Sequence, residues 1–145
     1  MKNIEVVRTA RLAILDEVGR MLLCRRSTEA KQRAGLWELP GGKIDDGETI
    51  VEGSIREIWE ETGIALDEGL VVREPLYNIY EYDKTVNKWF SRDFLLYGGR
   101  IAADQQIQLT EATAYLKMPV EEALQIFIDI PHQRAARRLL PTLVA

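Results

Sequence analysis

Three glutamates lie close together near the end of one predicted helix. Residues 49–62 favour a helix, which Gly63 would end in the left-handed conformation. At about 100° per residue, Glu57, Glu60 and Glu61 share one arc because three or four positions separate them. Two of them fall in the last turn, where the helix dipole disfavours anions. Clustered carboxylate oxygens are hard ligands, so the pattern predicts a site for Mg²⁺ or Mn²⁺.

The acidic excess of the whole chain is concentrated in the segment that contains this helix. Residues 41–64 hold seven acidic and two basic residues, a local charge of −5, whereas the 145-residue chain has a formal charge of −4. Carboxylates at this density repel one another, and a bound cation would offset that repulsion. The alternative is a solvated acidic face. Gly53, a poor helix former on the same arc, weighs against it because it leaves room for something to approach.

The segment before the helix also suits a site for ions. Gly41, Gly42 and Gly47 permit tight turns, and a glycine loop before a helix can present backbone N–H groups to an anion. Glu48 could bend back towards the carboxylates of the helix. Arg56 has glutamates four positions away on both sides, so we expect it to orient these side chains rather than to contact substrate.

Strands and helices alternate in the elements that must position these residues. We predict strands over residues 4–15, 20–26 and 36–39, a hairpin of strands over 71–82 and 89–97, and further helices over 120–128 and 132–140. Pro40-Gly41-Gly42 should break regular structure, and Gly98-Gly99 should end the hairpin. Because hairpins require antiparallel neighbours, the pattern favours a mixed sheet covered by helices. The helix over 49–62 should bury the stripe formed by Val51, Ile55, Ile58, Trp59 and Thr62.

Composition restricts the class of protein. A chain of 145 residues with 46% hydrophobic and 29% charged residues fits one globular domain. Its mildly acidic charge gives no bulk attraction to nucleic acid or anionic membranes, so we expect no stable complex with either. No signal-like or membrane-spanning run is present, and the expected compartment is the cytoplasm. Cys24, the single cysteine, excludes an internal disulfide and should pack as a small buried hydrophobe.

The spacing of the acidic segment is similar to that of a known family. It reads Gly42, five residues, Glu48, seven residues, Arg56-Glu57-Ile58, one residue, Glu60-Glu61, one residue, Gly63-Ile64. This resembles a complete Nudix box, and the lead-in from Trp37 to Gly42 also resembles that of Nudix (MutT-like) hydrolases. The resemblance implies a single domain over residues 1–145 with an α/β/α sandwich around a mixed β-sheet. It also implies a magnesium-dependent hydrolase, with Mn²⁺ as a substitute, of substrates that link a nucleoside diphosphate to another group.

The resemblance also implies roles for individual residues. Glu57, Glu60 and Glu61 match metal ligands, Glu48 matches an outer or accessory ligand, Arg56 matches an orienting arginine, and the carbonyl of Gly41 or Gly42 would complete the coordination. Glu57, Glu60 or Glu111 would accept the proton of the attacking water. Glu111 matches the further acid that follows the box in relatives, because the stretch 119–122 comes at a suitable distance after it. An ordinary loop acid is the alternative for Glu111.

Two arginines are candidates for contacting substrate. Arg26 matches a phosphate-contacting arginine of MutT-like relatives, and Arg11 lies where relatives line the substrate pocket; simple surface exposure is the alternative for both. Arg25, one residue from Arg26 on a strand, should point to the opposite face. Aromatic residues of the hairpin could stack on a base or fill the core, and they are Tyr77, Tyr80, Tyr82, Trp89 and Phe90.

The resemblance to the MutT group favours a small-molecule nucleotide substrate, a nucleoside triphosphate, oxidised or not, cleaved to monophosphate and pyrophosphate. ADP-ribose and dinucleoside polyphosphates stay open, and a coenzyme A substrate fits less well. A catalytically silent Nudix ligand-binding module is the alternative from another class, and the intact carboxylates disfavour it. Gly53-Ser54 and Lys117 depart from the usual residues and loosen the subfamily assignment. A monomer and a homodimer are both compatible with the sequence.

Overall fold

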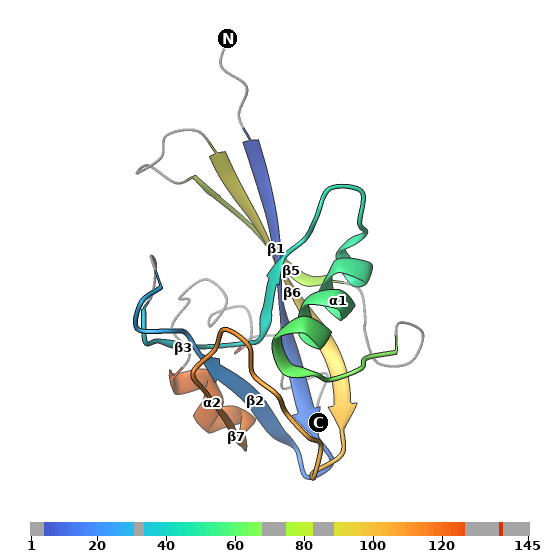
Figure 1. Cartoon of the computed structure of the whole chain (residues 1–145), viewed down its shortest axis with the longest axis vertical. Helices are drawn as coiled ribbons and strands as arrows, with labels where there is room; N and C mark the ends of the chain where they lie inside the picture. The colour runs from blue at the N-terminus through green and yellow to red at the C-terminus, as the bar shows by residue number, and fades with distance from the viewer. Residues whose placement is uncertain (1–4, 31–33, 68–74, 83–88, 127–136, 138–145) are drawn as a thin grey trace.

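The computed structural model describes residues 5–30, 34–67, 75–82, 89–126 and 137 of the chain. This part contains strands β1 (Glu5–Asp16), β2 (Arg20–Arg25), β3 (Trp37–Glu38), β4 (Gly41–Lys43), β5 (Pro75–Tyr82), β6 (Trp89–Ile101) and β7 (Ala114–Pro119), and helices α1 (Ile50–Thr62) and α2 (Val120–Ile126) (Figure 1). The helix expected over 132–140 lies outside the described residues. No helix among the described residues is long and apolar enough to cross a membrane.

The strands form one mixed sheet, as the hairpins and interleaved helices predicted. Its order is β3-β2-β1-β6-β5, with β4 paired to β1 and β7 paired to β2. β1 runs parallel to β6 along its whole length, whereas β1–β2 and β5–β6 are antiparallel. The long central strands therefore join an N-terminal half, which carries β2 to β4, to the hairpin expected in the second half of the chain.

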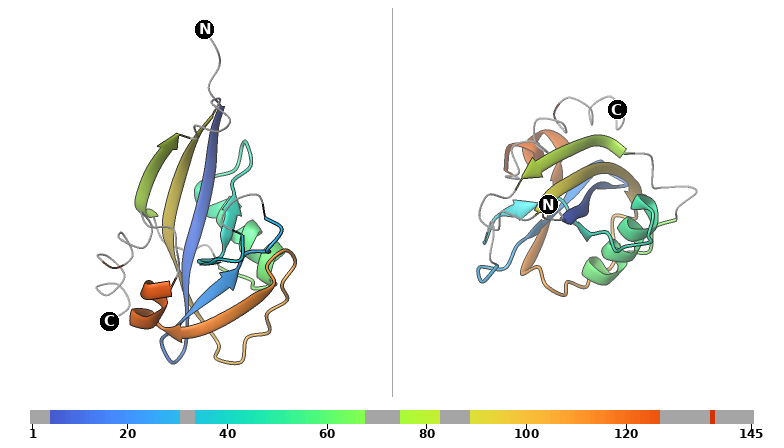
Figure 2. Two further views of the ribbon diagram at one scale, coloured as in Figure 1. Left: turned by 90° about the vertical axis from the view of Figure 1, so that its left-hand side faces the viewer. Right: turned by 90° about the horizontal axis from the view of Figure 1, so that it is seen from above.

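The sheet has an apolar layer on each face because neighbouring side chains of a strand point in opposite directions. Leu12 and Ile14 of β1 pack in a cluster that includes Ile58 of α1, whereas Ala13 and Leu15 pack in a cluster that includes Leu124 of α2. The two helices consequently lie on opposite sides of the sheet (Figure 2). This arrangement is the expected α/β/α sandwich.

The caps of α1 agree with the sequence. Thr49 accepts a hydrogen bond from the Glu52 N–H through its side chain, and Gly63 ends the helix with φ of 73°. The predicted apolar stripe is correct for Ile58 but wrong for Trp59, which is 56% exposed. α1 is rotated about its own axis relative to the prediction, so that Gly53, which lies outside the predicted stripe, is buried instead. An added Cβ at Gly53 would approach Ile44 and Glu48, so these side chains occupy the space that the glycine leaves.

Two glycine pairs lie in strands rather than breaking them. Gly41 and Gly42 belong to β4, which pairs antiparallel with β1, and the expectation of irregular backbone there is wrong. Gly41 has φ of 150°, and a Cβ on it would collide with the carbonyl oxygen of Ala10, so only glycine lets the two strands pair here. The pair Gly98-Gly99 does not end β6, because the extra residue is absorbed by a bulge opposite β1 and the strand continues to Ile101.

Candidate active site

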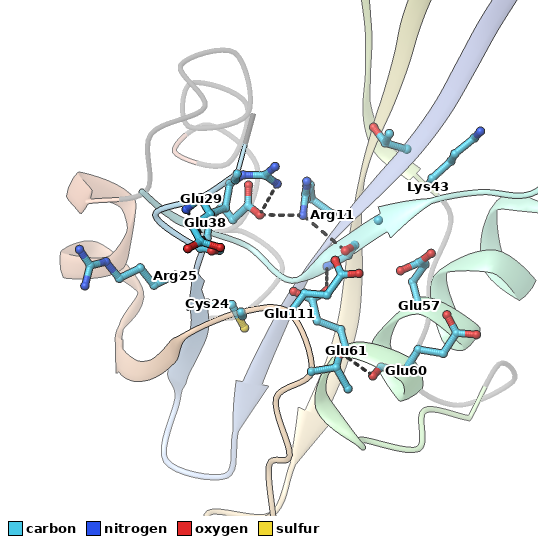
Figure 3. Close-up of a pocket in the computed structure, with 18 residues that line it drawn as sticks. Arg11, Cys24, Arg25, Glu29, Glu38, Lys43, Glu57, Glu60, Glu61 and Glu111 are labelled. Carbon is cyan, nitrogen blue, oxygen red and sulfur yellow. Dashed lines mark hydrogen bonds and ion pairs between the residues drawn. The ribbon is translucent and has the colours of Figure 1, made fainter. Parts of the chain in front are cut away.

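A cleft of about 830 Å³ opens between α1, strands β1 to β4 and residues 102–113, the segment that joins β6 to β7 (Figure 3). Its acidic lining comes from distant parts of the sequence and consists of Glu29, Glu38, Glu57, Glu60, Glu61 and Glu111. The fold therefore brings the glutamates of the helix into one cleft with Glu111. Arg11 and Arg26, the candidate substrate-binding residues, line the same cleft.

The glycines of β4 allow the helix carboxylates to lie against the sheet. The N–H of Gly41 donates to Glu61 Oε2 at 3.0 Å. A Cβ on Gly42 would collide with the carboxylate of Glu57, so the bare backbone at this position makes room for that side chain. The glycine pair is thus explained by close approach, and β4 and α1 together form one wall of the cleft.

Arg56 binds several glutamates at once, which is the geometry predicted for an orienting residue. Its Nε and Nη2 donate to the two oxygens of Glu48 at 2.8 and 2.9 Å, a bidentate pair. Its Nη1 donates to Glu57 Oε1 at 3.1 Å and to Glu60 Oε2 at 3.0 Å. The bonds from Arg56, together with the N–H of Asp45, lower the pKa of Glu48 to about 2. Glu48 is therefore a firmly charged partner for Arg56 beneath the cleft.

Burial acts differently on the remaining carboxylates. Desolvation raises the pKa of Glu61 to about 7, although Arg11 and the Gly41 N–H partly oppose this effect. Desolvation also raises the pKa of Glu57, against the opposing influence of Arg56. Carboxylates whose pKa values are raised by burial in a cleft are typical of functional sites.

The donor set fits a hard divalent cation in an open site. Glu57, Glu60, Glu61 and the carbonyl of Gly41 supply oxygen atoms to one cleft. Within the described ranges, no three Asp, Glu, His or Cys side chains form a ready-made metal cluster. Arg56 holds Glu57 and Glu60, and the Gly41 carbonyl accepts a long hydrogen bond of 3.4 Å from Arg11. Mg²⁺ suits such a site because it keeps several waters and takes further ligands from substrate phosphates.

Glu38 is the residue that the sequence interpretation missed. Its Oε1 accepts from Arg11 Nη1 and from Arg26 Nη1, both at 3.2 Å, and the residue is only 8% exposed. Both partners are distant in sequence, so no local charge pattern pointed to this role. The signal available was its place in the lead-in 37–42. Glu38 thus holds the two candidate substrate-binding arginines side by side.

Other predicted features of the cleft have mixed outcomes. Arg25 borders the cleft, but its Nε donates to the Gly35 carbonyl at 2.9 Å and its guanidinium points away from the helix glutamates (Figure 3). Cys24 is buried as expected, and burial raises the pKa of its thiol, which therefore stays protonated. The side chains of the hairpin aromatics lie outside the described residues.

Comparison with known proteins identifies close similarity over nearly the whole chain. A family model described as NUDIX domain matches residues 6–143. A CTP pyrophosphohydrolase of Escherichia coli (strain K12) is 34% identical over 134 residues, which cover 90% of this chain and 89% of that protein. The crystal structure of a MutT protein from Methanosarcina mazei Go1 matches with a TM-score of 0.77 and 28% identity over 95% of both chains. The solution structure of the E. coli ORF135 protein matches with a TM-score of 0.72 and 26% identity, over 94% of this chain and 91% of that chain.

Proposed function

Because the chain belongs to the Nudix hydrolase family, we propose that it cleaves a nucleoside triphosphate to monophosphate and pyrophosphate with Mg²⁺ as its cofactor and Mn²⁺ as a substitute. The observation that carries this proposal is the convergence of Glu57, Glu60, Glu61 and Glu111 with Arg11 and Arg26 on one cleft. Such a cleft suits the polyphosphate of a nucleotide, because its acidic wall can take cations and its arginines can take phosphate oxygens.

The wall formed by α1 and β4 would hold the cation. When bound, the cation neutralises phosphate oxygens and lowers the pKa of a water molecule. Glu57, Glu60 and Glu61 would be its ligands, with the Gly41 carbonyl completing the set and Glu48 as an outer, accessory ligand. The position of Arg56 supports an orienting role, since it forms ion pairs with Glu48, Glu57 and Glu60.

Glu111 is our candidate for the general base, with Glu57 or Glu60 as alternatives. Glu57 and Glu60 each accept a hydrogen bond from Arg56 Nη1, so one oxygen of each carboxylate is already engaged. Glu111 is exposed to the cleft, and among the described residues no donor binds its carboxylate. It also belongs to a segment outside α1, so it could reach a water from a direction that the helix glutamates do not share.

Arg11 and Arg26 would bind the phosphates that lie beyond the cleaved bond. Their guanidinium groups line the cleft and share the carboxylate of Glu38, so their positions are set before substrate arrives. Preorganised donors lose less conformational entropy on binding than free surface arginines do.

CTP is the first substrate to test, because the relative with 89% of its length aligned is a CTP pyrophosphohydrolase. The test is a panel of about twenty compounds with Mg²⁺, including the common and oxidised nucleoside triphosphates, ADP-ribose and dinucleoside polyphosphates. We expect a triphosphate to yield monophosphate and pyrophosphate, identified by chromatography. Preferred cleavage of ADP-ribose or of a dinucleoside polyphosphate would replace the triphosphate proposal, and binding without cleavage of any compound would identify a silent ligand-binding module.

A further inference from the structure

The segment that carries Glu111 is attached to the C-terminal end of α1. The last carbonyls of a helix lack partners within the helix and need donors from elsewhere. At this end the N–H of Gly63 donates to the Trp59 carbonyl, but the N–H of Ile64 donates to the Thr62 hydroxyl. The carbonyl of Glu60, which Ile64 would ordinarily satisfy, therefore needs another donor.

The segment 102–113 supplies that donor through a side chain. The hydroxyl of Thr110 donates to the Glu60 carbonyl at 3.1 Å, and the N–H of Gln108 donates to the neighbouring Thr62 carbonyl at 2.8 Å. Beyond Glu111, the N–H of Thr113 donates to the Arg25 carbonyl at the end of β2, at 3.0 Å. The residues before Glu111 are thus bound to α1, and a residue after it is bound to the end of β2.

Of these attachments, the bond of Thr110 is the one nearest to Glu111 and the one that depends on a side chain. The backbone bonds survive any substitution that keeps the chain conformation. Leu109 and Ala112, which flank the pair, pack against the apolar cluster under α1 and also hold the segment in place. Loss of the Thr110 hydroxyl should therefore leave the segment folded but free the backbone directly beside Glu111.

We propose that Thr110 is a positioning residue for Glu111. Its hydroxyl fastens Glu111 to the same helix turn that carries Glu60 and Glu61, so the two walls of the cleft keep a fixed separation. This inference rests on the proposed function, since it assigns a role to the residue that precedes the candidate base. Small errors in the position of a catalytic group are costly, because a displacement of about 1 Å can reduce the rate of a reaction roughly 100-fold.

Thr110→Val tests this role, because valine keeps the shape of threonine and removes the hydroxyl. We expect kcat to fall about tenfold with KM within about twofold, since the proposed phosphate contacts come from Arg11 and Arg26 and not from Thr110. Thr110→Ser, which restores the hydroxyl, should return kcat to within about twofold of the wild type. Thr113→Val is the matched control, because it makes the same chemical change in the same segment at a hydroxyl that binds no described residue, and it should leave kcat unchanged.

A double substitution distinguishes positioning from general loosening of the fold. In a Glu111→Gln background, Thr110→Val should reduce kcat by less than about twofold, because the group that Thr110 positions has already lost its function. A full further tenfold loss in that background, or equal activities of the valine and serine variants, would overturn the inference. So would a normal kcat for Glu111→Gln. Failure of the proposed function is distinguishable, because the wild-type protein would then cleave no compound of the panel.

Discussion

A single oxygen atom of Glu38 accepts hydrogen bonds from both Arg11 and Arg26, and this predicts that Glu38 contributes to substrate binding. Glu38→Gln keeps the size of the side chain but removes the charge that Arg11 and Arg26 share. We expect KM for the nucleotide to rise about tenfold with a smaller change in kcat. The reason is that a hydrogen bond from an arginine to a charged carboxylate is stronger than one to the neutral amide of glutamine, so the two arginines would be held less firmly. Steady-state kinetics with the preferred substrate measures both parameters.

The control for this substitution is another glutamate of the cleft. Glu29→Gln removes a charge from the same lining, but no described arginine binds the Glu29 side chain. It should leave KM within about twofold of the wild-type value. Equal effects of the two substitutions would show that only the net charge of the cleft matters, and Glu38 would then have no specific positioning role.

Glu61 is the most buried of the helix carboxylates, and its removal should separate activity from stability. Glu61→Gln withdraws a proposed metal ligand, so we expect activity to fall about 100-fold or more. The melting temperature should rise slightly, since burial disfavours the charged form and raises the pKa of Glu61 to about 7. Activity assays and thermal unfolding of the same samples test both parts. Asp46→Asn, an exposed acid of the preceding loop, is the control and should change neither; loss of activity that follows unfolding would contradict a catalytic role for Glu61.

At the scale of elements, the turn between β1 and β2 is held by one buried carboxylate. Asp16 is 1% exposed and accepts from the N–H groups of Val18 and Arg20 at 3.0 and 2.9 Å and from Arg20 Nε at 2.8 Å. Lys117 lies 4.0 Å from it, and Arg100 binds its backbone carbonyl. Burial acts to raise the pKa of Asp16, but the hydrogen bonds and charge of Arg20 outweigh it and the pKa is lowered.

A lowered pKa in the folded state makes the stability of the protein depend on pH. The carboxylate of Asp16 stabilises the fold above the pKa of the unfolded chain, near 4, and this contribution is lost as the pH falls through the lower pKa of the folded state. We expect Asp16→Asn to lower the free energy of unfolding by about 2 kcal/mol at pH 7 and to flatten its decline below pH 4. Denaturant unfolding between pH 7 and pH 3 measures this, with the exposed Asp104→Asn as control. Parallel curves for the wild type and Asp16→Asn would rule out this linkage.

The elements that the sequence predicted well are those with local signals. Thr49 and Gly63 lie next to the helix that they cap, so the helix could be placed to within one residue. The glutamates of α1 could be assigned for the same reason, since helical periodicity alone brings them together. The position of Glu111 in the cleft agrees with the expectation, but that expectation came from the family resemblance and not from a local pattern.

Features that depend on distant contacts could not be predicted in this way. β4 forms only because Gly41 and Gly42 pair with β1, about 30 residues earlier in the chain. Trp59 is exposed because the roll of α1 is set by packing against the sheet, which periodicity does not specify. Glu38 acquires its role from Arg11 and Arg26, which lie 27 and 12 positions away.

At the scale of the whole molecule, the cation should couple activity to stability. Exhaustive chelation should abolish turnover, and Mg²⁺ or Mn²⁺ should restore it, because the proposed reaction needs a cation to neutralise phosphate oxygens and to lower the pKa of the attacking water. Added Mn²⁺ should also raise the melting temperature of the substrate-free protein, since a ligand that binds only the folded state stabilises it. The Glu61→Gln variant should show a smaller shift. Full turnover after chelation would contradict this prediction.

The parallel pairing of β1 with β6 has a consequence for the order in which the molecule assembles. Glu5 pairs with Trp89, and the later residues of β1 continue this ladder with one bulge, so it joins positions about 84 residues apart. The β1–β2 hairpin and α1 can form from nearby residues. The pairing of β1 with β6, in contrast, can form only after the long intervening segment has brought the two strands together. Closing so long a loop is slow, and sheets built on such contacts fold more slowly than helical proteins of similar size. During synthesis, the first strand therefore leaves the ribosome well before its main partner does, and one of its long edges stays uncovered until β6 arrives.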